Sequence, residues 1–284
     1  MKWYKKYLSI YEKEYKDIPI ETINEVRNKI TKLQNDNPLV SIVIIAYNEE
    51  KHLLANLWSL SDTICHYPIE IIGIDNNSVD ATADIYKNTG VKYYKEERHG
   101  CGYARQSGMD HAKGKYCVCM DADTIYPPHY VEIMSKKLIC SPQNIGVYSL
   151  WSYFPDNNHS YLGLKIYESL RDLYLFLQSF KRPELNVRGM VFAYRIEEGK
   201  KVGFRVDIKR GEDGSLALGL KKYGKLFFLH NKKARAITRY GTMNIIDGSF
   251  FNSFKKRAIK AMKNGFCIFK KKSKYMDQES NIIK

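Results

Sequence analysis

Three short apolar runs, each followed at once by polar residues, constrain the fold of this 284-residue chain more than any other feature. The runs span residues 39–46, 69–74 and 116–120, and segments with apolar residues at helical spacing separate them. Strands that alternate with helices at short intervals indicate βαβ units and a parallel sheet. We therefore expect an α/β fold with a mostly parallel central sheet flanked by helices, and a further strand over residues 91–94.

The third run ends in Asp121-Ala122-Asp123, the most informative stretch of the sequence. Alternate residues of a strand point to the same side, so both carboxylates are expected at its carboxyl end, where open α/β sheets bind ligands. Two carboxylates form a hard oxygen site suited to Mg²⁺ or Mn²⁺. A solvated loop or a helix N-cap is the alternative. The other two runs also end in polar residues, 47–49 and 75–77, and a parallel sheet brings all three sets to one edge.

The second half of the sequence is less regular, without internal repeats or a long linker. We expect strands and helices in the following places: strands over 146–153, 188–194 and 225–230, and helices over 161–180 and after 209–213. The two halves are therefore expected to share one sheet and one cleft.

These motifs occur in an order and rough spacing that resemble a known family. The matching segments are 40–49, 74–80, 102–108, 121–123 and 211–216. They make the chain similar to glycosyltransferase family 2, the inverting, nucleotide-sugar-dependent enzymes of GT-A fold. The resemblance covers roughly two hundred residues of the chain, and it implies a single Rossmann-like GT-A domain with N- and C-terminal helical extensions.

The resemblance also implies a division of the chain. Residues 1–37 would form the N-terminal helical extension, and residues 38–245 the GT-A domain. Within that domain, 38–126 would be the nucleotide-sugar-binding half and 127–245 the acceptor half. Residues 246–284 would form a basic amphipathic tail.

A nucleotide-sugar site is implied along the sheet edge. Ala46, Tyr47 and Glu49 would line the nucleobase pocket. Asp75, with Asn76 beside it, would read the base edge by accepting a hydrogen bond from a ring N–H. The alternative for Asp75 is a simple turn residue.

The resemblance further assigns Asp121, Ala122 and Asp123 to the donor site. Asp123 would chelate the Mn²⁺ or Mg²⁺ that bridges the diphosphate, and Asp121 would contact the ribose or a metal-bound water. The metal would act as a Lewis acid on the leaving group. Arg105 would hold phosphate oxygens, which suit a guanidinium, unless it is a solvent-facing helical residue. His230 would be a further metal ligand, with an exposed strand-end histidine as the alternative.

Inverting transfer also needs a base on the acceptor side. Asp213 matches the family's catalytic base, and Glu212 lies beside it. Acidic residues in a first helical turn also favour the helix dipole, so helix capping is the alternative. Residues 188–190 fall where the family shapes the acceptor cleft, while Arg235 and Arg239 would help to hold the diphosphate.

The function implied is that of a metal-dependent glycosyltransferase of the hexosyltransferase type. It would move a sugar from a nucleoside-diphosphate sugar, with UDP favoured, to a hydroxyl of a glycan or lipid-linked acceptor in cell-surface glycan or glycolipid assembly. The Gln/Arg-rich motif of processive polysaccharide synthases is absent, which favours a single addition. The alternatives are an inactive GT-A nucleotide-binding or scaffold protein and a basic nucleic-acid-binding protein.

The charge of the chain and its lack of targeting signals indicate which partners and which compartment to expect. The net charge of +15 suits anionic partners. Residues 250–274 are basic and amphipathic, which predicts binding to an anionic membrane surface, or else a helix with a solvated cationic face. No nucleic-acid-binding motif occurs, so no specific nucleic acid is expected. Without a recognisable signal peptide, a long apolar run or paired cysteine spacings, we expect a cytoplasmic protein, free or peripheral on the cytoplasmic membrane face.

Overall fold

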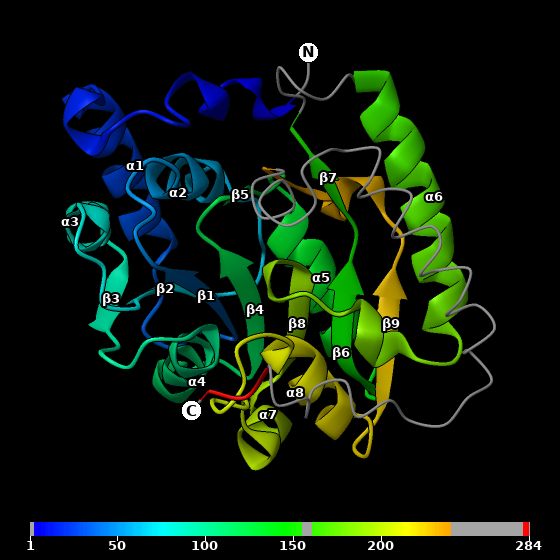
Figure 1. Cartoon of the computed structure of the whole chain (residues 1–284). Helices are drawn as coiled ribbons and strands as arrows, with labels where there is room; N and C mark the ends of the chain where they lie inside the picture. The colour runs from blue at the N-terminus through cyan, green and yellow to red at the C-terminus, as the bar shows by residue number, and fades with distance from the viewer. Residues whose placement is uncertain (1–2, 155–160, 240–280, 284) are drawn as a thin grey trace.

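The computed structural model describes residues 3–154, 161–239 and 281–283 (Figure 1). Within them, seven strands form the main sheet in the order β3-β2-β1-β4-β8-β6-β9. These strands are β1 (Val40–Ala46), β2 (Ile69–Asp75), β3 (Lys92–Lys95), β4 (Tyr116–Asp121), β6 (Asn144–Ser149), β8 (Phe192–Arg195) and β9 (Lys225–Leu229). A smaller sheet has the order β5-β10-β7. Its strands are β5 (Thr124–Ile125), β7 (Trp151–Tyr153) and β10 (Ala236–Thr238).

The main sheet is mostly parallel, as the sequence predicts. β1 pairs in parallel with β2 and β4, β2 with β3, and β6 with β9. Only β8 runs the other way, antiparallel to both β4 and β6. The halves of the chain therefore contribute to one sheet, and β8 joins them next to the central strand, β4.

Helices cover both faces of this sheet (Figure 1). The α-helices are α1 (Ile20–Leu33), α2 (Leu53–Ser61), α3 (Thr82–Asn88), α4 (Cys101–His111), α5 (Tyr130–Ile139), α6 (Tyr161–Ser179), α7 (Ile196–Val202) and α8 (Glu212–Leu220). Short 3-10 helices are η1 (Trp3–Lys5), η2 (Tyr7–Ser9), η3 (Tyr15–Asp17), η4 (Pro183–Asn186), η5 (Gly189–Val191) and η6 (Lys232–Ala234). Buried residues of α1, α2, α3 and α5 form the core on one face, and those of α4, α7 and α8 form the core on the other.

Burial on two faces explains why the central strands read as continuous apolar runs. In β1, Ile42 and Ile44 enter the first core while Val43, between them, enters the second. In β4, Val118 and Cys119 divide in the same way. Cys119 thus acts as a small apolar side chain of the interior.

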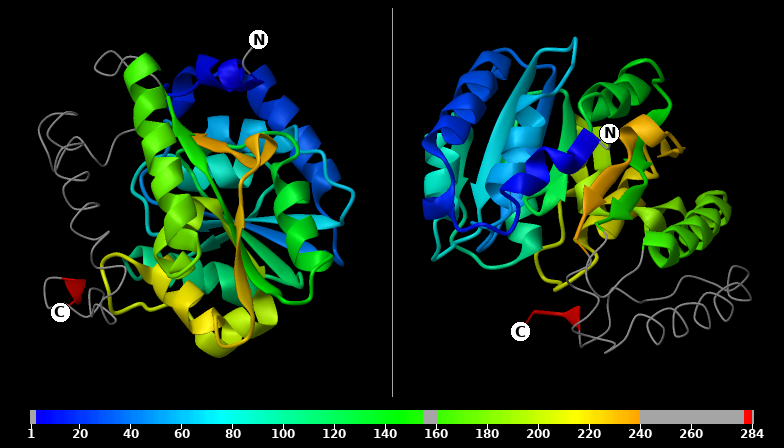
Figure 2. Two further views of the ribbon diagram at one scale, coloured as in Figure 1. Left: turned by 90° about the vertical axis from the view of Figure 1, so that its right-hand side faces the viewer. Right: turned by 90° about the horizontal axis from the view of Figure 1, so that it is seen from above.

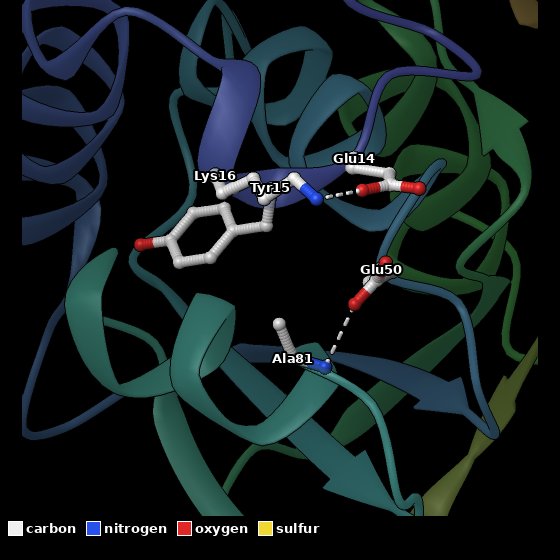
Figure 3. A pocket seen from close by; sticks show the side chains of 5 residues that line it. All are labelled: Glu14, Tyr15, Lys16, Glu50 and Ala81. Atoms are coloured by element: carbon white, nitrogen blue, oxygen red, sulfur yellow. Dashed lines mark hydrogen bonds and ion pairs between the residues drawn. The ribbon is translucent and has the colours of Figure 1, made fainter.

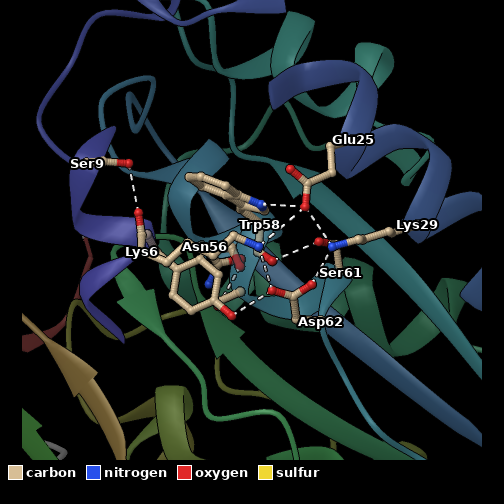
Figure 4. A network of polar contacts seen from close by, with 10 residues as sticks. Lys6, Ser9, Glu25, Lys29, Asn56, Trp58, Ser61 and Asp62 are labelled. Atoms are coloured by element: carbon tan, nitrogen blue, oxygen red, sulfur yellow. Dashed lines mark hydrogen bonds and ion pairs between the residues drawn. The ribbon is translucent and has the colours of Figure 1, made fainter. Parts of the chain in front are cut away.

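The N-terminal segment is joined to the sheet layer by apolar packing and by ion pairs. Tyr7 is buried in the first core, and its hydroxyl donates to Asp62 at 2.9 Å. Lys6 and Lys29 bind the same carboxylate at 3.0 and 2.6 Å, and both also contact Glu25 (Figure 4). Two lysines thus link α1, α2 and the segment before them.

Two segments differ from the sequence prediction. The strand expected over 146–153 is two strands, β6 in the main sheet and β7 in the small one. β6 pairs with β9, whereas β7 pairs with β10. The strand expected over 188–194 begins as η5, and only Phe192–Arg195 pairs as β8.

The basic tail expected to bind membranes, 250–274, lies outside the described residues, as does most of 246–284. None of the helices in the described part of the chain has the length and apolar character needed to cross a membrane.

Candidate active site

The ends of three neighbouring strands form the candidate site. Strand register places Ala46 of β1 opposite Asp75 of β2, and Ile45 of β1 opposite Asp121 of β4. Asp75 and Asp121 therefore flank the carboxyl end of β1, at the edge where open α/β sheets bind ligands. In Figure 1, the arrow of β4 points toward the N-terminal segment, so this edge faces that segment.

A buried arginine joins two of the expected acids. Arg105, on α4, is 3% exposed. Its guanidinium contacts Asp121 through Nη2, and its Nε lies 3.2 Å from Oδ1 of Asp213. Its Nη1 also donates to the carbonyl of Met120 at 3.3 Å. Arg105 therefore is not the solvent-facing residue that one reading allowed; it brings β4 and α8 together by charge.

Gly189 makes room for this arginine. A Cβ at position 189 would collide with the Arg105 guanidinium. The Gly189 N–H also donates to Oδ2 of Asp213 at 2.7 Å. Gly189, in the segment 188–190 that is expected near the acceptor cleft, thus contacts the expected base directly.

Asp213 and Glu212 open α8 and are both buried. Gly211, with φ of 97°, turns the chain into the helix in a conformation that favours glycine. Burial raises the pKa of Asp213 above its ordinary range, although Arg105 opposes the shift. Burial, with Asp213 beside it, raises the pKa of Glu212 to about 7. Oδ1 of Asp213 accepts no hydrogen bond from the described residues and has only the ion-pair contact with Nε of Arg105 at 3.2 Å.

Asp123 lies in the turn between β4 and β5 and pairs with a different arginine. Arg239 Nε is 3.5 Å from Asp123 and its Nη2 is 3.8 Å from Glu49. Burial, together with the charges of Asp121 and Glu49, raises the pKa of Asp123 to about 6. The charge of Asp123 is therefore opposed by Arg239 but reinforced by two neighbouring carboxylates, and such a site favours an added cation.

The donor set around Asp123 fits a hard divalent cation such as Mn²⁺ or Mg²⁺. Asp123 and Asp121 would supply carboxylate oxygens, and their side chains are 25% and 37% exposed. His230 does not join them: it follows β9, which is separated from β4 by β8 and β6. Indeed, the described residues contain no group of three or more Asp, Glu, His or Cys side chains that could hold a metal. The expected ligand role of His230 is therefore without structural support.

The loops after β1 and β2 carry the residues expected to bind the nucleoside. Tyr47 is half exposed, and its ring packs edge-on against His99 at 5.2 Å. Asp75 is buried and accepts a hydrogen bond from Ser78 N at 3.0 Å, as a turn residue does. Glu49 contacts Nδ1 of His52 at 2.5 Å. The Tyr47 and His99 rings thus form an aromatic pair at the carboxyl edge of the main sheet.

Three of the expected nucleotide-binding residues have buried side chains with other roles. Ala46 and Ala122 are 4% and 2% exposed and pack in the first core, so only their backbones could face a ligand. Asn76 donates to the carbonyls of Glu96 and Arg98 and accepts from Gly100 N. Asn76 therefore fixes the loop after β3.

Sequence reasoning missed the part that the N-terminal segment plays. Tyr11 donates to the carbonyl of Asp123 at 2.7 Å, and its ring packs on His52 and Phe154. Glu12 lies 3.1 Å from Nε2 of His52. His99 was also missed. No local signal marks these residues, because their partners are far away in the sequence.

Two further features lie apart from this chemistry. Arg235, expected near the diphosphate, binds Asp172 of α6 and the Trp151 carbonyl instead. A hollow of about 220 Å³ lies between the N-terminal segment and the loops after β1 and β2 (Figure 3). It is lined by Glu14, Tyr15, Lys16, Glu50 and Ala81. None of the acids of the candidate site faces this hollow.

Comparison with known sequences identifies the family. The family model described as glycosyl transferase family 2 matches residues 41–199, more than half of the chain. Glycosyltransferase GlyA of Streptococcus pneumoniae is 26% identical over 190 residues, which is 62% of this chain and 27% of that protein. An uncharacterized glycosyltransferase of Methanocaldococcus jannaschii is 33% identical over 134 residues, 45% of this chain and 46% of that protein. The chain thus spans less than half the length of these relatives.

Solved structures share the fold. TarS of Staphylococcus aureus (residues 1–349) has a TM-score of 0.53 and 18% identity over 82% of this chain and 75% of that one. The mannosyltransferase PcManGT of Pyrobaculum calidifontis, in complex with GDP-Man and Mn²⁺, has a TM-score of 0.55 and 18% identity over 85% and 72%. Glucosyl-3-phosphoglycerate synthase of Mycobacterium tuberculosis, in complex with Mn²⁺, UDP and glucosyl-3-phosphoglycerate, has a TM-score of 0.54 and 19% identity over 86% and 84%. From its motifs, its sheet and these matches, the chain belongs to glycosyltransferase family 2 and has the GT-A fold.

Proposed function

We propose that the protein is a divalent-metal-dependent, inverting glycosyltransferase. It transfers a sugar from a nucleoside-diphosphate sugar, with UDP favoured, to a hydroxyl of a glycan or lipid-linked acceptor in cell-surface glycan or glycolipid assembly. The observation that carries the proposal is the Asp121–Arg105–Asp213 chain of charges beside Asp123. The donors named in structures of similar fold, UDP-GlcNAc, UDP-Glc and GDP-Man, support the substrate class.

Asp213 acts as the base. Its buried carboxylate has a raised pKa, and Oδ1 accepts no hydrogen bond from the described residues, so the carboxylate accepts the proton of the acceptor hydroxyl. The acceptor oxygen then bonds to the anomeric carbon as the bond to the diphosphate breaks, and the electron pair leaves with the diphosphate. Attack from the face opposite the leaving group inverts the anomeric centre. Gly189 N–H and Arg105 hold the carboxylate in place during this step.

Asp123 and Asp121 hold the cation, Mn²⁺ or Mg²⁺, in this proposal. When bound, the cation supplies charge neutralisation for the departing diphosphate. Arg239, which pairs with Asp123, lies where it can turn to phosphate oxygens once the carboxylate binds the cation.

We also place the protein in the cytoplasm, because the five described cysteines are all free thiols, as a reducing compartment favours.

A thermal-shift screen of UDP- and GDP-sugars, each with Mn²⁺ and with EDTA, tests the proposal. A cognate donor raises the melting temperature by mass action only when Mn²⁺ is present. The same donor, mixed with candidate hydroxyl acceptors, then releases nucleoside diphosphate and yields a product of inverted anomeric configuration. A thermal shift with neither transfer to an acceptor nor hydrolysis of the donor by water would favour the inactive scaffold alternative instead.

A further inference from the structure

α6 turns its apolar side chains outward. Eight of the fifteen exposed large hydrophobic side chains in the described residues lie between 161 and 180. Residues three and four positions apart share one face of a helix, and the exposed side chains follow this spacing. The apolar stripe, as we name this face, consists of Leu162, Ile166, Leu170, Leu173, Phe176, Leu177 and Phe180. Figures 1 and 2 show α6 along the outside of the molecule.

Both acids of α6 face the protein instead. Glu168 accepts hydrogen bonds from Ser152 Oγ at 2.9 Å and from Tyr153 N at 2.7 Å. Asp172 binds the guanidinium of Arg235. The side chains of both acids are 13% exposed.

The basic residue in the middle of α6 is also turned inward. Arg171 is 8% exposed at its side chain, pairs with Asp172 at 2.8 Å and lies over the Trp151 ring at 4.4 Å. An ordinary surface helix buries its apolar face and exposes its charges. α6 buries Leu164, Tyr167 and Leu175 together with its acids and Arg171, and it carries a second apolar face on the outside. A contiguous exposed apolar patch of this kind marks a protein or membrane contact.

Charge indicates which occupant fits the apolar stripe. The outer face carries no carboxylate, and exposed Lys165 and Lys181 lie near its two ends. The chain's own basic residues, 255–274, gain no electrostatic attraction from a face without acids, and the net charge of +15 opposes a second copy. An anionic lipid surface fits both the apolar stripe and the lysines near its ends. Its acyl layer takes up Leu and Phe side chains, and its headgroups attract lysine.

We propose that α6 is a membrane-docking helix that lies flat on an anionic lipid surface, with the apolar stripe inserted. Lying flat agrees with α6 not being apolar enough to cross a membrane. Through Arg235, α6 is tied to the start of β10, which pairs with β5, the strand that follows Asp123 directly. Docking would therefore hold the candidate active site in a fixed position relative to the lipid surface. The proposal does not depend on the glycosyl-transfer chemistry.

Vesicle flotation of the full chain tests this inference. Binding is expected to vesicles that contain phosphatidylglycerol and to be much weaker on phosphatidylcholine alone. The triple variant L170Q/L173Q/L177Q removes apolar groups that are at least half exposed, so it should fold normally and lose more than about tenfold in partitioning. The matched control I20Q/I64Q/V79Q makes the same change at exposed positions elsewhere and should bind as the unmodified protein does.

Three outcomes would overturn the proposal. One is equal flotation of the stripe variant and the unmodified protein. Another is loss of flotation only in K270Q/K271Q/K272Q, which would make the basic segment the docking element. The third is a change from dimer to monomer in the stripe variant without a change in flotation, which would make the stripe an interface between copies. Independently, tryptophan at position 176 (F176W) should be quenched by brominated lipid, and unquenched fluorescence would contradict insertion.

Discussion

Tyr11 donates a hydrogen bond of 2.7 Å to the backbone carbonyl of Asp123, although 112 residues separate them in the sequence. The bond holds the turn that carries the candidate metal ligand. Burial, with the charge of Asp123 nearby, raises the pKa of the Tyr11 phenol, so the hydroxyl keeps its proton and stays a donor. The N-terminal segment, which the family model does not cover, therefore takes part in building the site.

Replacing Tyr11 with Phe is expected to weaken Mn²⁺-dependent donor binding by up to about tenfold, since one net hydrogen bond contributes about 0.5–1.5 kcal/mol. Calorimetric titration with donor and Mn²⁺ measures the change. Tyr15→Phe is the matched control, because its hydroxyl bonds to Asn88 on the surface. Equal affinities of both variants would remove Tyr11 from the site.

Asp123→Asn is expected to abolish Mn²⁺-dependent binding of the nucleotide sugar. The substitution keeps the shape of the side chain but removes the charge that a hard cation needs. Calorimetry with and without Mn²⁺ provides the measurement, and Asp84→Asn, at an exposed site on α3, is the control. Unchanged affinity in the Asp123 variant would refute its role as a ligand.

Asp213→Asn is expected to leave donor binding intact and to lower kcat by about 10²–10⁴-fold, the usual contribution of a general base. Glu212→Gln changes the neighbouring carboxyl, whose pKa is also raised, and should lose far less. Steady-state kinetics with a cognate donor separate kcat from KM. If the Glu212 variant is the inactive one, the base has been assigned to the wrong residue.

Arg105→Met is expected to lower the free energy of unfolding by about 3–5 kcal/mol, because it leaves a buried carboxylate without its partner. The double variant R105M/D213N removes the charges of both and should recover part of the loss. Urea denaturation measures each variant. Additive effects in the double variant would show that the 3.2 Å pair contributes little.

Asp62 should make stability depend on pH. Burial alone would raise the pKa of Asp62, but hydrogen bonds from Lys29, Lys6 and Tyr7 outweigh it and hold the pKa below 3.8, its ordinary value. A lowered folded-state pKa adds stability that is present above the unfolded pKa and is lost as pH falls through the folded one. Asp62→Asn should therefore cost about 1–2 kcal/mol at pH 7. The gap between the two proteins should narrow below about pH 4, and a gap of constant size would contradict this account.

Local patterns were sufficient for the parallel sheet. The strands β1, β2 and β4 were predictable because an apolar run bounded by turn residues reports burial on both faces. The end of β4 at Asp121 and the start of α8 at Glu212 were also predictable from local sequence patterns. By contrast, 146–153 reads as one strand, because no local property shows that β6 and β7 pair in different sheets.

By itself, the sequence determined the family, the sheet and the acids at its edge, since each depends on the order and periodicity of nearby residues. Tertiary structure alone decided how these acids are paired: Arg105 with Asp121 and Asp213, and Arg239 with Asp123. It also separated His230 from the other candidate ligands. Such pairings join residues far apart along the chain. They depend on strand order and on which face of each helix meets the sheet, and short-range patterns do not encode either property.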